Sequence, residues 1–219
     1  MSTLPVLHFS DVLCVWAYAA EIRLQELRRQ FSAEVAVEHH FVSIYGDIHR
    51  RIERQGIGYE GYSRKIREIA ARFDHVKVHD ELFIRNVPHS SMPAHLFLSA
   101  VRLLDEGEPA GGGLERALAA VRAAFFEEGV DVSSTPELLS IAERLGLPVA
   151  KVEAHLQSGR AHASLGYDLE LQKKYDVAVS PAFVLNEGRQ RLNGNVGYRV
   201  LEANVRELLR HPADEFSWC

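Results

Sequence analysis

The hydrophobic pattern at the start of the chain predicts a strand, a helix and a second strand. Residues 6–10 form a short apolar run typical of a buried strand, and residues 15–30 carry apolar side chains at helical spacing. Residues 35–44 return to the pattern of a strand. Two strands joined by a helix are expected to pair in parallel, so the opening of the chain indicates an α/β layer.

The pattern then changes to helical spacing without strands, from about Asp47 to Leu165. Thr135-Pro136-Glu137 has the order of an N-cap, a proline in the first turn and an acidic first turn. The predicted helices are a short one that starts at Ile48 and lies before Gly56, then residues 63–73, 94–104, 114–128, 135–146 and 149–158. The glycine-rich stretch 106–113 is expected to be a flexible connector between two of them.

A sheet pattern reappears near the end of the chain. The predicted elements are a helix over 167–175, a strand over 181–185, a hairpin turn at 186–188, a strand over 190–192 and a helix over 198–209. The order is therefore βαβ, a helical block, then αββα, which is the order of an α/β thioredoxin-like fold with a large inserted all-helical domain. We expect residues 1–46 and 163–212 to form the thioredoxin-like domain, residues 47–162 the insertion, and residues 213–219 a C-terminal tail.

Charge and composition narrow the class of protein. The 219 residues include 25 Lys and Arg against 30 Asp and Glu, a net charge of −5, which gives no general attraction for nucleic acid or anionic membrane. We find no apolar run of transmembrane length, and no basic-then-apolar signal segment precedes the first strand. A cytoplasmic protein is expected. The chain has only two cysteines, Cys14 and Cys219, so we do not expect disulfide bonds to hold the fold together.

The 11 histidines invite a metal-binding interpretation. The candidate pairs are His39 with His40, His75 with His79, and His89 with His95. No cysteine or acidic residue completes a compact set of ligands around any pair, so no metal site is predicted.

Cys14 is the main candidate for a catalytic residue, because it lies between the end of the first predicted strand and the start of the first predicted helix. Backbone N–H groups and the positive end of the helix dipole meet a thiol there, and both favour the reactive thiolate. The other interpretation is a small buried hydrophobic side chain, which free cysteines often are. Asp11 is expected to cap the loop or the helix rather than transfer protons. Ala17 stands where a Cys-x-x-Cys motif would have its second thiol.

Two segments carry a resemblance to a known family. Residues 10–18, Ser-Asp-Val-Leu-Cys-Val-Trp-Ala-Tyr, together with residues 177–185, Val-Ala-Val-Ser-Pro-Ala-Phe-Val-Leu, resemble the DsbA-like thioredoxin family. More narrowly, the chain is similar to the FrnE-like branch, next to the 2-hydroxychromene-2-carboxylate isomerases and the kappa-class glutathione transferases. Ala94-His95 and the stretch 125–139 resemble that branch's helical insert.

The resemblance implies roles for particular residues. Cys14 matches the attacking cysteine of the family's Cys-Pro-Trp-Cys motif, and Trp16 matches its tryptophan, either as a wall of the thiol site or as core. Pro181 matches the proline whose preceding peptide bond is cis, which makes Ser180 a substrate contact. Asn195 lies where kappa-type relatives hold the γ-glutamyl end of glutathione, although the acidic residue of their motif is missing here.

Two departures from the motif shape the expected reaction: Val15 replaces its proline and Ala17 its resolving cysteine. We therefore expect a single-cysteine thiol–disulfide oxidoreductase with glutathione as co-substrate and no covalently bound cofactor, acting on a small thiol or disulfide or on a protein disulfide. A glutathione-dependent isomerase or transferase and a non-catalytic peptide-binding module are the alternatives. Cys219 is a candidate for a substitute resolving thiol, and a homodimer is left open.

Overall fold

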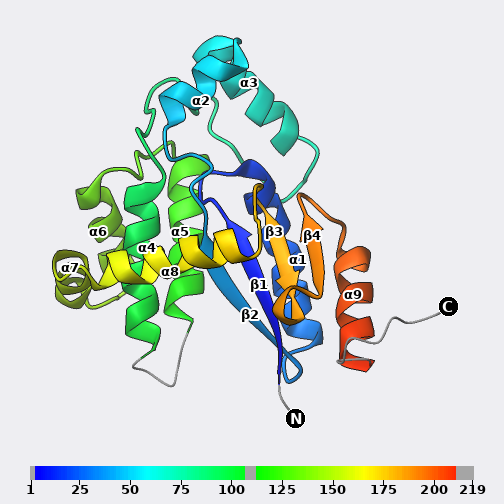
Figure 1. Cartoon of the computed structure of the whole chain (residues 1–219). Coiled ribbons are helices and arrows are strands. Elements are labelled where there is room, and N and C mark those ends of the chain that lie inside the picture. Colours follow the sequence, from blue (N-terminus) through cyan, green and yellow to red (C-terminus); the bar gives the residue numbers. More distant parts are fainter. Residues whose placement is uncertain (1–2, 107–111, 211–219) are drawn as a thin grey trace.

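The computed structural model describes residues 3–106 and 112–210, which fold around a four-stranded mixed sheet (Figure 1). The strands are β1 (Leu4–Ser10), β2 (Val35–Phe41), β3 (Ala182–Leu185) and β4 (Gln190–Asn193). The helices are α1 (Val15–Gln30), α2 (Ile48–Gln55), α3 (Gly58–Ala70), α4 (Met92–Asp105), α5 (Gly113–Phe126), α6 (Thr135–Arg144), α7 (Val149–Gln157), α8 (Arg160–Lys174) and α9 (Tyr198–Arg210). The predicted thioredoxin-like α/β fold with a helical insertion is confirmed.

The sheet has the order β2-β1-β3-β4, with β1 parallel to β2 and antiparallel to β3. The parallel pair follows from the predicted β-α-β opening, in which α1 carries the chain back across the sheet. Strands β3 and β4 form the predicted hairpin. Gly188, at φ 95°, belongs to the turn of that hairpin, and a Cβ there would lie 3.0 Å from the ring of Tyr175.

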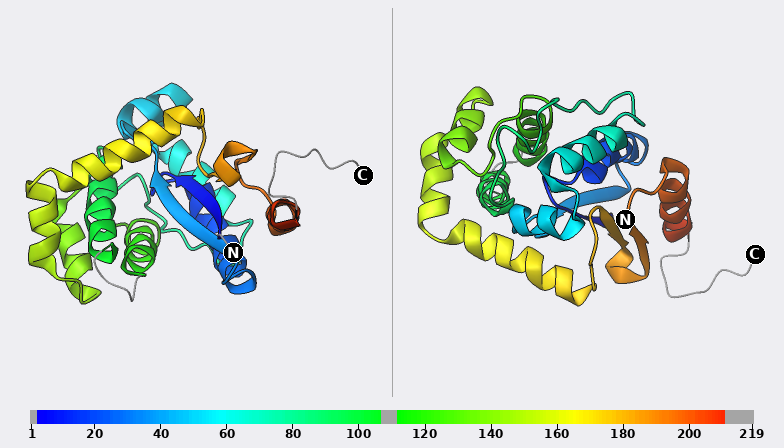
Figure 2. Two further views of the ribbon diagram at one scale, coloured as in Figure 1. Left: turned by 60° about the horizontal axis from the view of Figure 1, so that its bottom comes forward. Right: turned by 90° about the horizontal axis from the view of Figure 1, so that it is seen from above.

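Helices cover both faces of the sheet (Figure 2). Side chains alternate across a strand, so Val6 and its neighbours on one face pack against α1 and α9, through residues such as Leu24 and Leu201. Phe9 on the opposite face packs against Leu171 of α8. The result is three layers, with the sheet in the middle.

The remaining helices form a block beside the edge strand β2, and α2 and α3 lie over one end of the sheet (Figure 1). Phe97, Leu118 and Phe125 are fully buried in the core of this block. That core is continuous with buried residues of the Cys14 loop, such as Val12 and Leu13, so the helical block and the sheet support the same loop.

Several boundaries differ from the sequence prediction; helix α3, for example, begins at Gly58 rather than at Ser63. Helix α8 begins at Arg160, about two turns before the predicted start at Tyr167. The first turns of α8 carry mostly polar side chains, so the apolar spacing used to predict helices is missing there. Helix α6 begins at Thr135 with Ser134 as the N-cap, so Thr135 is not the cap. The predicted division at residues 46 and 162 remains a prediction, and α8 runs through the second of these boundaries.

Candidate active site

Cys14 is the N-cap residue of α1, at the end of the loop that follows β1. Its backbone is extended, at φ −85° and ψ 113°, and its side chain is only 4% exposed. The Cys14 carbonyl accepts the N–H of Tyr18 at 3.0 Å, which starts the helical hydrogen-bond ladder. The thiol therefore lies at the first turn of α1, where the N–H groups of Trp16 and Ala17 face the sulfur.

The carboxylate of Asp11 holds the Cys14 loop in place from inside the protein. Oδ1 accepts the N–H of Leu13 at 3.0 Å, while Oδ2 accepts the N–H of Tyr45 at 2.7 Å and the hydroxyl of Ser91 at 2.8 Å. Asp11 is fully buried, so these bonds replace its hydration. The expected capping role is seen for the loop, but Asp11 does not cap α1, and it also ties the loop to the segment after β2 and to the start of α4.

His95 completes this attachment from α4. Its Nε2 accepts the N–H of Val12 at 3.1 Å and lies 3.7 Å from the Asp11 carboxylate. Burial lowers the pKa of His95, which favours the neutral ring that can accept this bond. The Cys14 loop is therefore fixed by groups from the helical block as well as from the sheet.

The segment before β3 meets Cys14 from the other side. The Ser180–Pro181 peptide bond is cis, as the resemblance implies. The thiol of Cys14 donates to the carbonyl of Ser180 at 3.1 Å, and the hydroxyl of Ser180 accepts the N–H of Asp11 at 2.9 Å. That hydroxyl keeps its own proton for donation, so Ser180 can accept from the thiol and donate to the thiolate.

Burial raises the pKa of the Cys14 thiol above its ordinary value. The hydrogen bond from Ser180 and the backbone N–H groups of Ala17 and Trp16 lower it, and the charge of Asp11 raises it. The N–H groups at the helix start favour the thiolate, as expected, but the desolvation of the buried sulfur outweighs their effect. The thiol of the folded protein is therefore less acidic than that of a free cysteine.

A cavity of about 430 Å³ opens beside Cys14. Trp16, Val179 and Ser180 line it on one side, and α2 and α3 contribute the opposite wall. That wall includes Arg51 and Lys65, and none of the lining residues is an aspartate or a glutamate. The cavity therefore favours an anionic substrate or ligand.

The two cationic side chains in this wall, Arg51 and Lys65, are each held by neighbouring residues. The hydroxyl of Tyr62 donates to the hydroxyl of Tyr45 at 3.0 Å, and the guanidinium of Arg51 lies 4.4 Å from the centre of the Tyr45 ring. Burial holds the pKa of Tyr45 well above its ordinary value, so its phenol stays protonated. Lys65 donates to the side-chain carbonyl of Gln55 at 2.8 Å, which links α3 to α2.

The residues singled out in the sequence fall into three groups. Cys14, Trp16 and Ser180 line one cavity, and the ring of Trp16 also packs edge-on against Phe73, so it is both wall and packing residue. Asn195 is exposed and accepts a hydrogen bond from Arg23 of α1, outside the cavity lining. Gly194, next to it, donates to the Pro181 carbonyl at 2.8 Å. Cys219 lies outside the described residues.

Sequence reasoning missed Tyr45, Arg51, Tyr62 and Lys65, which form most of the polar wall. No motif marks them: Arg51 and Lys65 lie in segments predicted only as helices, and Tyr45 and Tyr62 lie between predicted elements. Within residues 3–106 and 112–210, no group of three or more His, Cys, Asp or Glu side chains could hold a metal ion. In the same part of the chain, no helix is both long and apolar enough to cross a membrane.

Comparison with known structures shows the fold. A Nitrosomonas europaea protein classed as a protein disulfide isomerase aligns with a TM-score of 0.78 at 16% identity, covering 97% of this chain and 100% of that one. The cytosolic disulfide reductase DsbM from Pseudomonas aeruginosa, in a structure with GSH, aligns with a TM-score of 0.67 at 20% identity, covering 93% and 100%. A 2-hydroxychromene-2-carboxylate isomerase aligns with a TM-score of 0.62 at 18% identity, covering 97% and 100%.

A search of the curated proteins finds no match. The family model of the DSBA-like thioredoxin domain, by contrast, matches residues 5–206. Because this match spans both halves of the sheet and the helical block between them, the chain belongs to the DSBA-like thioredoxin domain family, the DsbA-like thiol–disulfide oxidoreductases.

Proposed function

We propose that the protein is a single-cysteine, glutathione-linked thiol–disulfide oxidoreductase of the cytoplasm. The observation that carries this proposal is the position of Cys14 at the start of α1 beside Ser180 and Pro181, with Ala17 in place of a second thiol. The side chain of Ala17 is fully buried in the first turn of α1 and has no sulfur to offer. A mixed disulfide on Cys14 therefore needs an outside thiol to resolve it.

The reaction balances with glutathione as the only other thiol. The Cys14 thiolate attacks the glutathione sulfur of a mixed disulfide, forms a Cys14–glutathione disulfide and releases the substrate thiolate, which takes up a proton. A second glutathione thiolate then attacks the glutathione sulfur on Cys14. This step releases oxidised glutathione and restores the Cys14 thiolate, so the substrate is reduced and the one attacking glutathione is oxidised.

The chemistry of the cavity supports glutathione as the co-substrate. Glutathione is a tripeptide with two carboxylates, and the wall opposite Cys14 carries Arg51 and Lys65 with no acidic residue in the lining. The backbone of Ser180 lies directly at the thiol, where an extended peptide can pair with it. The structure of DsbM with GSH is a neighbour of the same fold. A reduced, buried Cys14 fits a cytoplasmic protein.

Glutathione-dependent reduction of a small mixed disulfide tests the proposal. Turnover is followed for the wild type, for Cys14→Ser and for Cys219→Ser. The expected result is loss of turnover in Cys14→Ser and full turnover in Cys219→Ser. Loss of turnover in Cys219→Ser instead would make the tail cysteine the resolving thiol, and the single-cysteine mechanism would be wrong.

An isomerase or transferase with glutathione as a bound cofactor is the second candidate. The aromatic and aliphatic part of the cavity wall favours it, because Trp16, Tyr62, Ile66 and Ile69 give an aromatic substrate a surface to pack on. Cys14→Ser separates the two functions. A serine variant that keeps full glutathione-dependent isomerase turnover favours this candidate and excludes a covalent step at Cys14.

A peptide-binding module without catalysis is the third interpretation, and alkylation of the thiol tests it. If Cys14 reacts with iodoacetamide no faster in the presence of glutathione analogues or peptides than in their absence, at any pH, then ligand binding does not activate the thiol. That result would favour a binding role for the groove beside Pro181.

A further inference from the structure

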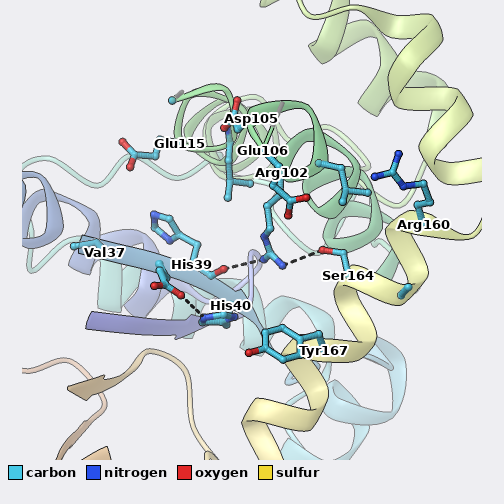
Figure 3. A pocket seen from close by; sticks show the side chains of 15 residues that line it. Val37, His39, His40, Arg102, Asp105, Glu106, Glu115, Arg160, Ser164 and Tyr167 are labelled. Atoms are coloured by element: carbon cyan, nitrogen blue, oxygen red, sulfur yellow. Dashed lines mark hydrogen bonds and ion pairs between the residues drawn. The ribbon is translucent and has the colours of Figure 1, made fainter. Parts of the chain in front are cut away.

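A second and larger cavity lies on the other side of β2 from the Cys14 site. Its volume is about 570 Å³, and it is enclosed by the free edge of β2 and by helices α4, α5 and α8 (Figure 3). It shares no lining residue with the cavity beside Cys14. Ligand sites are common at such junctions between a sheet and an inserted domain.

The inner wall of this second cavity is a buried ion-pair cluster around Asp168. Arg102 donates to both carboxylate oxygens of Asp168, at 3.0 and 2.9 Å, and Nδ1 of His40 lies 2.7 Å from the same carboxylate. The other ring nitrogen of His40, Nε2, has no hydrogen-bond partner in the described part of the chain, although His40 is only 5% exposed. Its nearest charged neighbour is the carboxylate of Glu38, at 3.7 Å.

One face of α8 supplies further hydrogen-bond donors to the cavity. Arg160, Ser164 and Tyr167 are spaced at helical intervals, and their side chains lie on the cavity side of the helix (Figure 3). The hydroxyl of Ser164 accepts from Arg102 at 3.2 Å and keeps its own proton for donation. Arg160 has no hydrogen bond or ion pair with any described residue. With His40 Nε2, these groups form a subsite suited to a carboxylate. Glu38 lines the same side of the cavity, so a ligand carboxylate would take the place of the Glu38 carboxylate beside His40 Nε2.

The opposite side of the cavity is acidic. Asp105, Glu106 and Glu115 gather at the end of α4 and the start of α5 (Figure 3). Asp105 accepts the N–H groups of Gly113 and Leu114, and Glu115 pairs with Arg28 at 2.9 Å. The C-terminal end of α4 adds the negative end of a helix dipole. This side is suited to an ammonium group.

The edge of β2 between these two sides can pair with an extended backbone. The carbonyl of His39 accepts from Arg102, and the N–H of Phe41 donates to Asp168 at 2.9 Å, so these residues direct their backbone groups away from β1. By the alternation of a strand, Val37 directs its N–H and C=O the same way, and Val37 lines the cavity. A backbone amide placed here could bond to Val37.

We propose that this cavity is a binding site for a short peptide with free termini. The carboxylate would contact Arg160, Ser164 and His40, the ammonium would face the acidic end of α4, and a backbone amide would pair with Val37. A peptide with free termini is the ligand expected here, because the hydrogen-bond donors for its carboxylate and the acidic residues for its ammonium group lie on opposite sides of the edge strand β2. The site is independent of the redox chemistry at Cys14.

Saturation-transfer NMR with a mixture of dipeptides and tripeptides of Ala, Leu and Phe tests this site. The same peptides with acetylated amino ends or amidated carboxyl ends are the ligand controls. We expect binding of the free peptides and much weaker binding of both blocked forms. Arg160→Gln should weaken the free peptides about tenfold, the effect of one charge-assisted hydrogen bond, and leave the amidated peptides unchanged.

Two control variants locate the bound peptide. Arg199→Gln removes an exposed arginine from α9 and should leave binding unchanged. Lys65→Gln changes the cavity beside Cys14 and should also have no effect. The proposal is wrong if no free peptide binds at millimolar concentration, if blocked and free peptides bind alike, or if Lys65→Gln weakens binding while Arg160→Gln does not.

Discussion

Replacing Asp11 by asparagine tests how the Cys14 loop is held. The substitution keeps the size of the side chain but removes its charge and one of its two acceptor oxygens. In the protein, one oxygen accepts the N–H of Leu13 at 3.0 Å, and the other accepts the N–H of Tyr45 at 2.7 Å and the hydroxyl of Ser91 at 2.8 Å. The hydroxyl of Ser91 can turn to accept from an amide, but the two backbone N–H groups cannot.

The structure gives the size of the expected loss. Whichever way the amide lies, one backbone N–H faces its NH₂ group and loses a hydrogen bond to a charged acceptor in a fully buried place. Such a bond contributes about 1.5–3 kcal/mol, and the unpartnered N–H adds its desolvation cost, so Asp11→Asn should lower the free energy of unfolding by about 2–4 kcal/mol. The charge of Asp11 also raises the pKa of Cys14, so the variant should have a more acidic thiol.

Urea denaturation measures the first effect, and the pH dependence of iodoacetamide alkylation measures the second. Asp74→Asn, the same change at an exposed position, should alter the free energy of unfolding by no more than about 0.5 kcal/mol. If Asp11→Asn is as stable as the wild type and its thiol titrates at the same pH, Asp11 does not hold the loop, and the reasoning fails.

Three further predictions concern the thiol, the ion-pair cluster and the buried histidines. Ala17→Cys should place a second thiol one helical turn from Cys14 and introduce insulin reduction that is weak in the parent, together with shorter-lived mixed disulfides. Asp168→Asn should lower the free energy of unfolding by about 1.5–3 kcal/mol, because it leaves the half-buried Arg102 without its charged acceptor. Burial holds the pKa values of His8 and His39 well below 6.5, so the folded state excludes protons that the unfolded chain binds. Stability should therefore fall as the pH drops below about 6.5, by up to about 1.4 kcal/mol per pH unit for each histidine.

For each of these three predictions, a specific outcome would contradict the reasoning. Strong insulin reduction by the parent would show that the residue at position 17 does not decide the reaction. Denaturation of Asp168→Asn at the same urea concentration as the wild type would mean that the cluster adds nothing to stability. For the histidines, His8→Gln should remove part of the loss between pH 7.5 and 5.5, at most about 1.4 kcal/mol, and an unchanged pH dependence would contradict the assignment.

The order of the elements could be predicted because each carries its own periodic pattern. Trp16, Ala19 and Leu24 mark a helix by spacing alone, and Phe183 to Leu185 mark a buried strand. The first turns of α8 could not, because Arg160 and Ser164 face a cavity and show no apolar stripe. Their role depends on β2, which is more than a hundred residues earlier in the chain.

The candidate site was predictable only where a local motif exists. Cys14 and Pro181 stand out in the sequence, and the structure places Cys14 against Ser180. Arg51 and Lys65 have no local signature, because only the packing of α2 and α3 over the end of the sheet brings them to the thiol. The direction of the net pKa shift of Cys14 was not predictable for a related reason, since the strand-to-helix position is visible in sequence but the burial of the thiol is not.

Intact-mass spectrometry after incubation with oxidised glutathione at mildly alkaline pH tests the central claim most directly. The account predicts one glutathione per chain, attached to Cys14, which persists until reduced glutathione is added and is absent in Cys14→Ser. An unmodified Cys14, or a glutathione adduct that converts to an internal disulfide with Cys219, would contradict the claim that Cys14 works alone with glutathione.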